Sequence, residues 1–211
     1  PGGPPRPPYD SAGWTLAYQM GVQFDRLLDP FEGPFEVVPG LMKPPVGKVV
    51  DDKTKKAVGY VVGGQANDAF VAVNRLLAAK ENVYRLKGPI TVGSRIFPTG
   101  SFYVTASATA QPIVKKLADE VGLTFEAATV KVPADAIKMR PVRVGLWDRY
   151  GGTMPSGWTR FIFEQFEVPF EVVYAPTLDA GNLIAKYDVL VFVDGAIHER
   201  DGGGPDAFTG G

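Results

Sequence analysis

Hydrophobic positions along the chain follow two spacings, one typical of strands and one typical of helices. Short apolar runs rich in β-branched residues, which favour buried strands, occupy residues 46–50, 58–62, 142–146, 170–174 and 187–193. Glycines, prolines and charged residues separate these runs and predict turns. The alternation of strand-like and helix-like segments predicts an α/β chain.

Three stretches between these strands carry apolar residues at helical spacing. The first follows Asn67, a suitable N-cap, the second ends at Gly122, and the third begins where Ser156 is placed to cap it. The positions expected to face the core are Phe70, Val73, Leu76 and Leu77, then Ile113, Val114, Leu117 and Val121, and finally Phe161, Ile162 and Phe166. Each set lies on one helical face and predicts an amphipathic helix.

Turn signals predict three further strand features. Residues 35–38 form a strand-like run that ends at a Pro-Gly pair, and residues 124–132 could add another strand. Residues 95–104 contain two strand-like runs around residues 98–100, Pro-Thr-Gly, which predicts a hairpin.

Composition shifts along the chain divide it into four parts. The first ten residues contain five prolines, which favour an extended conformation, so we expect residues 1–45 to be a Pro-rich linker and strap. Residues 46–140 mix strands, a hairpin and two helices, and predict a mixed α+β unit. Residues 141–197 predict a βαβ unit, and the Gly-rich residues 198–211 a disordered tail.

The turn after the first strand of the βαβ unit is the one place where we expect a ligand. A right-handed crossover between two parallel strands places this turn at the carboxyl end of the sheet. Asp148, Arg149, Ser156 and Trp158 are the candidate binding residues, and with backbone N–H groups they could receive a carboxylate or a sugar. The structural interpretation is favoured: Ser156 caps the helix, Trp158 packs, and Asp148 pairs with Arg149 or Arg160.

Charge and hydropathy exclude several classes of partner. The 211 residues include 22 Lys and Arg against 23 Asp and Glu, a balance that argues against nucleic acid as a partner. The longest purely apolar run, residues 189–193, is far shorter than the roughly 20 residues that a membrane helix needs, so we expect no membrane span.

The residues that break covalent bonds are scarce. The sequence has no cysteine, which excludes a thiolate nucleophile, a disulfide and a thiolate metal site. Its one histidine, His198, is followed by Glu199, Arg200 and Asp201, and does not form the His-x-x-Glu pair of a zinc peptidase. We therefore expect no catalytic residues, no metal and no cofactor in this chain.

The second unit resembles the start of the class I glutamine amidotransferase-like fold, a flavodoxin-like, three-layer α/β arrangement. Active members of that family carry a cysteine on a strand-to-helix elbow, which this chain lacks, and the sheet is expected to be truncated after residue 193.

Three longer blocks resemble the region downstream of the catalytic domain in large bacterial zinc carboxypeptidase-like proteins. These are PYDSAGWTLAYQMGV at residues 8–22, DRYGGTMPSGWTRFIFEQF at residues 148–166, and LDAGNLIAKYDVLVFVDGAI at residues 178–197. The resemblance implies an accessory or binding module that is secreted or periplasmic, with the peptidase domain of the same polypeptide as its partner. The start at Pro1 is what we expect of a mature product or an excised piece.

Two other functions are kept open. One is an autonomous amidotransferase-like enzyme or small-ligand sensor that uses the turn from Asp148 to Trp158, and the other is a purely structural interaction protein. A small molecule, a peptide and a second copy of the chain, which would form a homodimer, remain open as partners.

Overall fold

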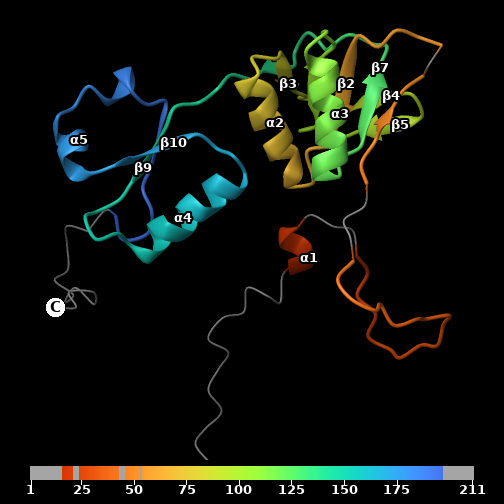
Figure 1. Cartoon of the computed structure of the whole chain (residues 1–211), viewed down its shortest axis with the longest axis horizontal. Coiled ribbons are helices and arrows are strands. Elements are labelled where there is room, and N and C mark those ends of the chain that lie inside the picture. Colours follow the sequence, from red (N-terminus) through yellow and green to blue (C-terminus); the bar gives the residue numbers. More distant parts are fainter. Residues whose placement is uncertain (1–15, 21–23, 43–45, 53, 197–211) are drawn as a thin grey trace, which may run out of the picture. The chain divides into compact units, whose positions relative to one another are not determined.

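The computed structural model describes residues 16–20, 24–42, 46–52 and 54–196. The chain divides into two compact units, Pro1–Arg140 and Pro141–Gly211 (Figure 1), and each is described here by itself. Both helices and strands are present in each unit, which confirms the predicted α/β class. The expectations for residues 1–15 and for the tail, residues 198–211, lie outside the described residues.

A six-stranded sheet in the order β1-β7-β2-β6-β3-β8 forms the centre of the first unit. Its strands are β1 (Val49–Val50), β2 (Gly59–Val62), β3 (Val83–Arg85), β6 (Phe102–Thr105), β7 (Phe125–Ala128) and β8 (Ile137–Lys138). Neighbouring strands are antiparallel except for β1 and β7, which are parallel. Two helices cross over between strands, α2 (Asp68–Ala78) from β2 to β3 and α3 (Ala110–Val121) from β6 to β7. The four strands in the order β7-β2-β6-β3 with these crossovers make the split βαβ, or ferredoxin-like, topology.

Apolar side chains cover both faces of this sheet. On one face, α2 and α3 lie side by side (Figure 1) and contribute Leu76 and Leu117 to a core shared with Phe102 and Phe125. On the other face, the hairpin of β4 (Ile90–Val92) and β5 (Arg95–Phe97) contributes Val92 and Phe97, which cluster with Val61 and Tyr103. All eight of these side chains are almost fully buried, so the first unit has a core on each side of its sheet.

The helices of the first unit follow the predicted periodicity with one exception. The core of α2 includes Leu76 as expected, but Phe70 is 47% exposed, and its ring meets that of Phe102 in a T-shaped arrangement with centroids 5.8 Å apart. Asn67 occupies the N-cap position of α2 without a side-chain capping hydrogen bond. Gly122 ends α3 in the left-handed conformation, with φ of 74°, as the sequence predicts.

The predicted hairpin across residues 98–100 is wrong. Strand β5 pairs instead with β4, the strand that precedes it in the sequence. The turn between them contains Gly93, whose φ of 59° suits a two-residue hairpin loop. Strand β6 joins the main sheet between β2 and β3. The predicted strand at residues 35–38 is also wrong, because this segment is exposed and pairs with no strand.

The second unit contains three parallel strands in the order β10-β9-β11. Its elements are β9 (Val144–Trp147), α4 (Met154–Gln165), β10 (Phe170–Val173), α5 (Ala175–Asp179), the 3₁₀ helix η2 (Leu183–Ala185) and β11 (Val189–Val191). The predicted parallel βαβ unit is therefore present. Three strands do not define a complete sheet, so the flavodoxin-like assignment stays a prediction.

A charged clamp joins the starts of β9 and β11. Arg143 donates from Nε to Oδ2 of Asp188 (3.1 Å) and from Nη2 to Oδ1 (3.2 Å), a two-pronged arrangement that fixes both side chains. These hydrogen bonds raise the pKa of Arg143 above its ordinary value. Arg143 Nη1 also donates to the carbonyl oxygen of Ala185 (2.6 Å), so the clamp fixes the connection into β11 as well.

We predict that Gly47→Ala destabilises the first unit by about 1–3 kcal/mol. Gly47 lies just before β1, and a Cβ there would clash with the backbone of Ala118 and Leu123, which cannot retract as a side-chain tip can. Urea unfolding followed by far-UV circular dichroism measures the change. Gly63→Ala is the matched control, because its Cβ would meet no atom within 4 Å and should alter stability by less than about 0.5 kcal/mol. Equal effects of the two substitutions would contradict the packing argument.

Candidate functional site

The strand order of the second unit selects one end of its sheet for a site. The chain leaves β9 toward β10 on one side and later returns to β11 on the other side. In parallel sheets with this reversal, ligands bind outside the carboxyl ends of the two strands that flank it. Here those strands are β9 and β11, which are followed by residues 148–153 and 192–196.

Asp148 is the first residue after β9 and is held rigidly. Its backbone N–H donates to the carbonyl oxygen of Val173 (3.0 Å), which extends the pairing of β9 with β10. Its Oδ1 accepts a hydrogen bond from the backbone N–H of Arg149 (2.8 Å), and the residue is only 3% exposed. The structure shows no ion pair between Asp148 and Arg149 or Arg160, so that part of the structural interpretation is wrong for the described residues.

The turn between Asp148 and α4 is open. Gly151 and Gly152 have φ of 89° and 75°, a conformation that favours glycine, and a Cβ at either position would meet no atom within 4 Å. Thr153 caps α4, since its Oγ1 accepts a hydrogen bond from the backbone N–H of Ser156 (3.2 Å). The predicted cap at Ser156 is therefore wrong, because the helix begins earlier, with Pro155 in its first turn.

Ser156 and Trp158 have opposite environments. Ser156 is fully buried, and its Oγ makes no hydrogen bond with the described part of the chain. Trp158 is 62% exposed and packs only at its contact with Phe161, whose ring it meets edge to face with centroids 6.0 Å apart. Of the four candidates, Asp148 and Ser156 are buried, whereas Arg149 and Trp158 are exposed.

Sequence reasoning missed an aromatic pair beside this turn. Tyr150 and Tyr174 stack with their ring centroids 4.7 Å apart and their planes within 5° of parallel. Each residue follows the end of one of two paired parallel strands, β9 and β10. Since carboxyl ends of parallel strands lie at the same edge, two aromatic residues just beyond them could have been recognised as neighbours.

The arrangement offers groups suited to binding a small ligand. It offers a fixed carboxylate, an open glycine turn and an exposed aromatic surface, which are features suited to hydrogen bonding and stacking. Within the described ranges, no three His, Asp or Glu side chains are grouped as metal ligands. His198 lies outside those ranges.

Comparisons of the chain with protein-family models, with curated proteins and with solved structures find no match. In the described part of the chain, no helix combines the length and the apolar character that crossing a membrane requires.

We predict that Thr153→Ala and Ser156→Ala change stability in different ways. Loss of the Thr153 cap should cost about 1 kcal/mol. Removal of the unpartnered Ser156 hydroxyl should leave stability unchanged or increase it, because a buried polar group without a hydrogen bond is unfavourable. Thermal unfolding of both variants followed by tryptophan fluorescence measures the difference. A Ser156→Ala variant as unstable as Thr153→Ala would show that the Ser156 hydroxyl has a stabilising partner.

Proposed function

We propose that the chain is a non-catalytic accessory module of an exported, secreted or periplasmic zinc carboxypeptidase-like protein. In this proposal it docks through apolar surface onto the peptidase domain of the same polypeptide. One observation and one expectation support it: the large apolar surface that the chain leaves uncovered, and the resemblance of three sequence blocks to the downstream region of such proteins. The uncovered surface is the observation that carries the proposal.

The first part of this surface is an apolar strap, residues 24–42. It has no helix or strand, and its large hydrophobic side chains are between 43% and 103% exposed. They are Phe24, Leu27, Leu28, Phe31, Phe35, Val37, Val38, Leu41 and Met42. Contiguous apolar patches larger than a few hundred Å² are rare on proteins that work alone and mark interaction sites. We therefore interpret the strap as a segment that packs against a partner domain.

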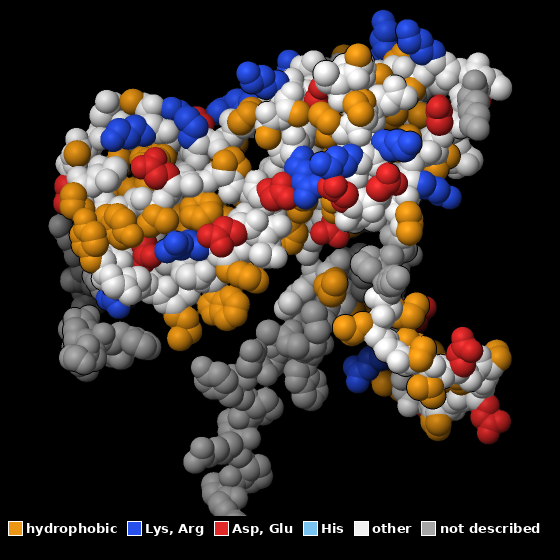
Figure 2. All heavy atoms as spheres, viewed as in Figure 1, with side chains coloured by type: hydrophobic (Ala, Val, Ile, Leu, Met, Phe, Trp, Pro, Cys, Tyr) orange, Lys and Arg blue, Asp and Glu red, His pale blue; other side chains and the backbone are white. Residues whose placement is uncertain are grey.

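The second part is the outer stripe of α4, formed by Met154, Trp158, Phe161 and Ile162. The spacing places these four side chains on one helical face, and each is at least half exposed. Figure 2 shows apolar side chains gathered on the surface of the second unit, with charged side chains between the groups. Among the described residues of this unit, only Leu146, Val173 and Tyr187 are fully buried hydrophobic residues. A partner that covered the outer stripe would supply the burial that the unit lacks.

The alternative, an autonomous enzyme or small-ligand sensor, would use the turn after β9. The buried carboxylate of Asp148 and the open turn at Gly151 and Gly152 favour binding of a polar ligand there. Catalysis would need a second reacting group, and the chain contains no cysteine. This alternative ranks second for that reason.

We expect the purified chain to bind less than about 0.1 equivalent of zinc and to release no C-terminal residue from peptides. The reason is that its residues form no zinc site of the His-x-x-Glu type. Metal analysis after dialysis and a peptide-trimming assay measure both quantities. Stoichiometric zinc binding, or peptide trimming that Asp148→Ala abolishes, would contradict the accessory-module proposal and support an autonomous enzyme.

We predict that Phe161→Lys weakens binding to the parent peptidase domain at least about ten-fold, because it puts a charge in the middle of the apolar stripe. Sedimentation velocity of the mixed domains measures the affinity. Glu164→Gln, on the same helix but outside the stripe, is the matched control and should bind like the wild type. Equal binding by all three proteins would remove α4 from the docking surface.

A further inference from the structure

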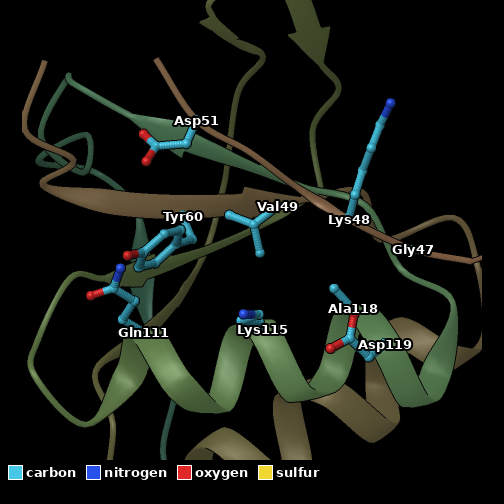
Figure 3. A pocket seen from close by; sticks show the side chains of 9 residues that line it. All are labelled: Gly47, Lys48, Val49, Asp51, Tyr60, Gln111, Lys115, Ala118 and Asp119. Atoms are coloured by element: carbon cyan, nitrogen blue, oxygen red, sulfur yellow. The ribbon is translucent and has the colours of Figure 1, made fainter. Parts of the chain in front are cut away.

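The first unit contains a cavity that none of the functions above uses. It has a volume of about 370 Å³ and lies between α3 and the face of the sheet at β1 and β2 (Figure 3). This volume is at the lower end of the roughly 300–1,000 Å³ of small-molecule sites. It is therefore large enough for a small ligand, and its chemistry can be assigned from its lining.

The floor of the cavity is apolar and its helical wall is polar. Val49, Ala118 and the ring of Tyr60 form the floor, and Ala118 and Tyr60 are at most 5% exposed. Gln111, Lys115 and Asp119 line the wall at intervals of four residues along α3, so they form one stripe (Figure 3). The residues on either side of β1, Lys48 and Asp51, add one positive and one negative charge to the lining.

The hydroxyl of Tyr60 is an unused donor in this cavity. Only 5% of the surface of Tyr60 is exposed, and its hydroxyl makes no hydrogen bond with another described residue. Tyr60 and Gln111 both line the cavity (Figure 3). Burial, and to a smaller extent the charge of Asp51, raises the pKa of Tyr60. The ring is buried, but the hydroxyl is not one of the enclosed polar atoms that lack a partner, so it opens on the cavity. It is a protonated donor at neutral pH, and a ligand in the cavity can accept a hydrogen bond from it.

The two charges on the wall are also unused. Neither Lys115 nor Asp119 forms an ion pair with another described residue. Their immediate neighbours on α3 differ, because Lys116 pairs with Glu120 (3.7 Å) and Glu120 also pairs with Arg75 (2.8 Å). A rise of 1.5 Å per residue separates Lys115 from Asp119 by about 6 Å along the helix axis. The wall therefore presents a cation and an anion about one dipeptide apart.

We propose that this cavity binds a short zwitterionic peptide of about two residues. The ligand's carboxylate accepts hydrogen bonds from Lys115, Gln111 and the Tyr60 hydroxyl. Its ammonium group donates to Asp119, and its side chains contact the apolar floor. The site is separate from the docking surfaces of the proposed function, so either proposal can fail without the other.

The test is a calorimetric titration of the full chain with alanyl-alanine. We expect saturable binding, and Lys115→Gln and Asp119→Asn should each weaken it at least about ten-fold, the loss of one charged hydrogen bond. Acetylation of the peptide's amine together with amidation of its carboxyl should abolish binding. Tyr60→Phe keeps the ring in the core and should weaken binding about three-fold or more.

Lys116→Gln is the matched control, since it removes the same charge from the next position of α3 and should leave binding unchanged. Circular dichroism of every variant checks that the fold is retained. Absence of binding to folded wild-type chain at millimolar peptide would overturn the proposal. So would equal binding of the doubly blocked peptide, or an effect of Lys116→Gln as large as that of Lys115→Gln.

Discussion

Burial of apolar surface is the constraint on which the rest of this structure depends, and the two units meet it unequally. In the first unit, helices cover one face of an antiparallel sheet and a hairpin covers the other, so both faces have a core. In the second unit, three parallel strands leave Val189 and Phe192 more than 40% exposed. Parallel sheets are normally covered on both faces. Exposed apolar surface is therefore found in the second unit as well as on the strap, residues 24–42 of the first unit.

The same imbalance explains the orientation of α4. This helix has two candidate apolar stripes, one through Trp158 and Phe161 and one through Phe163 and Phe166. In the structure the second stripe is the more buried one: Phe163 and Phe166 are partly buried, and the Phe163 ring meets that of Phe170 edge to face with centroids 5.5 Å apart. The larger side chains of the first stripe consequently face solvent.

This choice marks the limit of what the sequence could predict. Apolar periodicity was enough to locate α2, α3, α4 and their neighbouring strands, because it depends on residues close in sequence. It failed for the orientation of α4, and for the partner of β5, because both depend on contacts between distant segments. The turn at Gly93 and the turn at residues 98–100 are equally plausible hairpin signals, and only pairing of β6 with β2 and β3 separates them. The turn after β9 stays a predicted ligand site, and the structure corrects only its cap, which is Thr153 in place of Ser156.

The cavity of the first unit could not be found from the sequence for a related reason. Lys115 and Asp119 look like any charged pair on the exposed side of an amphipathic helix, and such pairs usually stay in solvent. What distinguishes them is the hydroxyl of Tyr60, which lies more than 50 residues earlier and reaches α3 only because β2 occupies the middle of the sheet. The strand order thus turns an ordinary helical surface into the wall of a cavity. An unpartnered phenol, more than the charges themselves, makes that wall a candidate binding site.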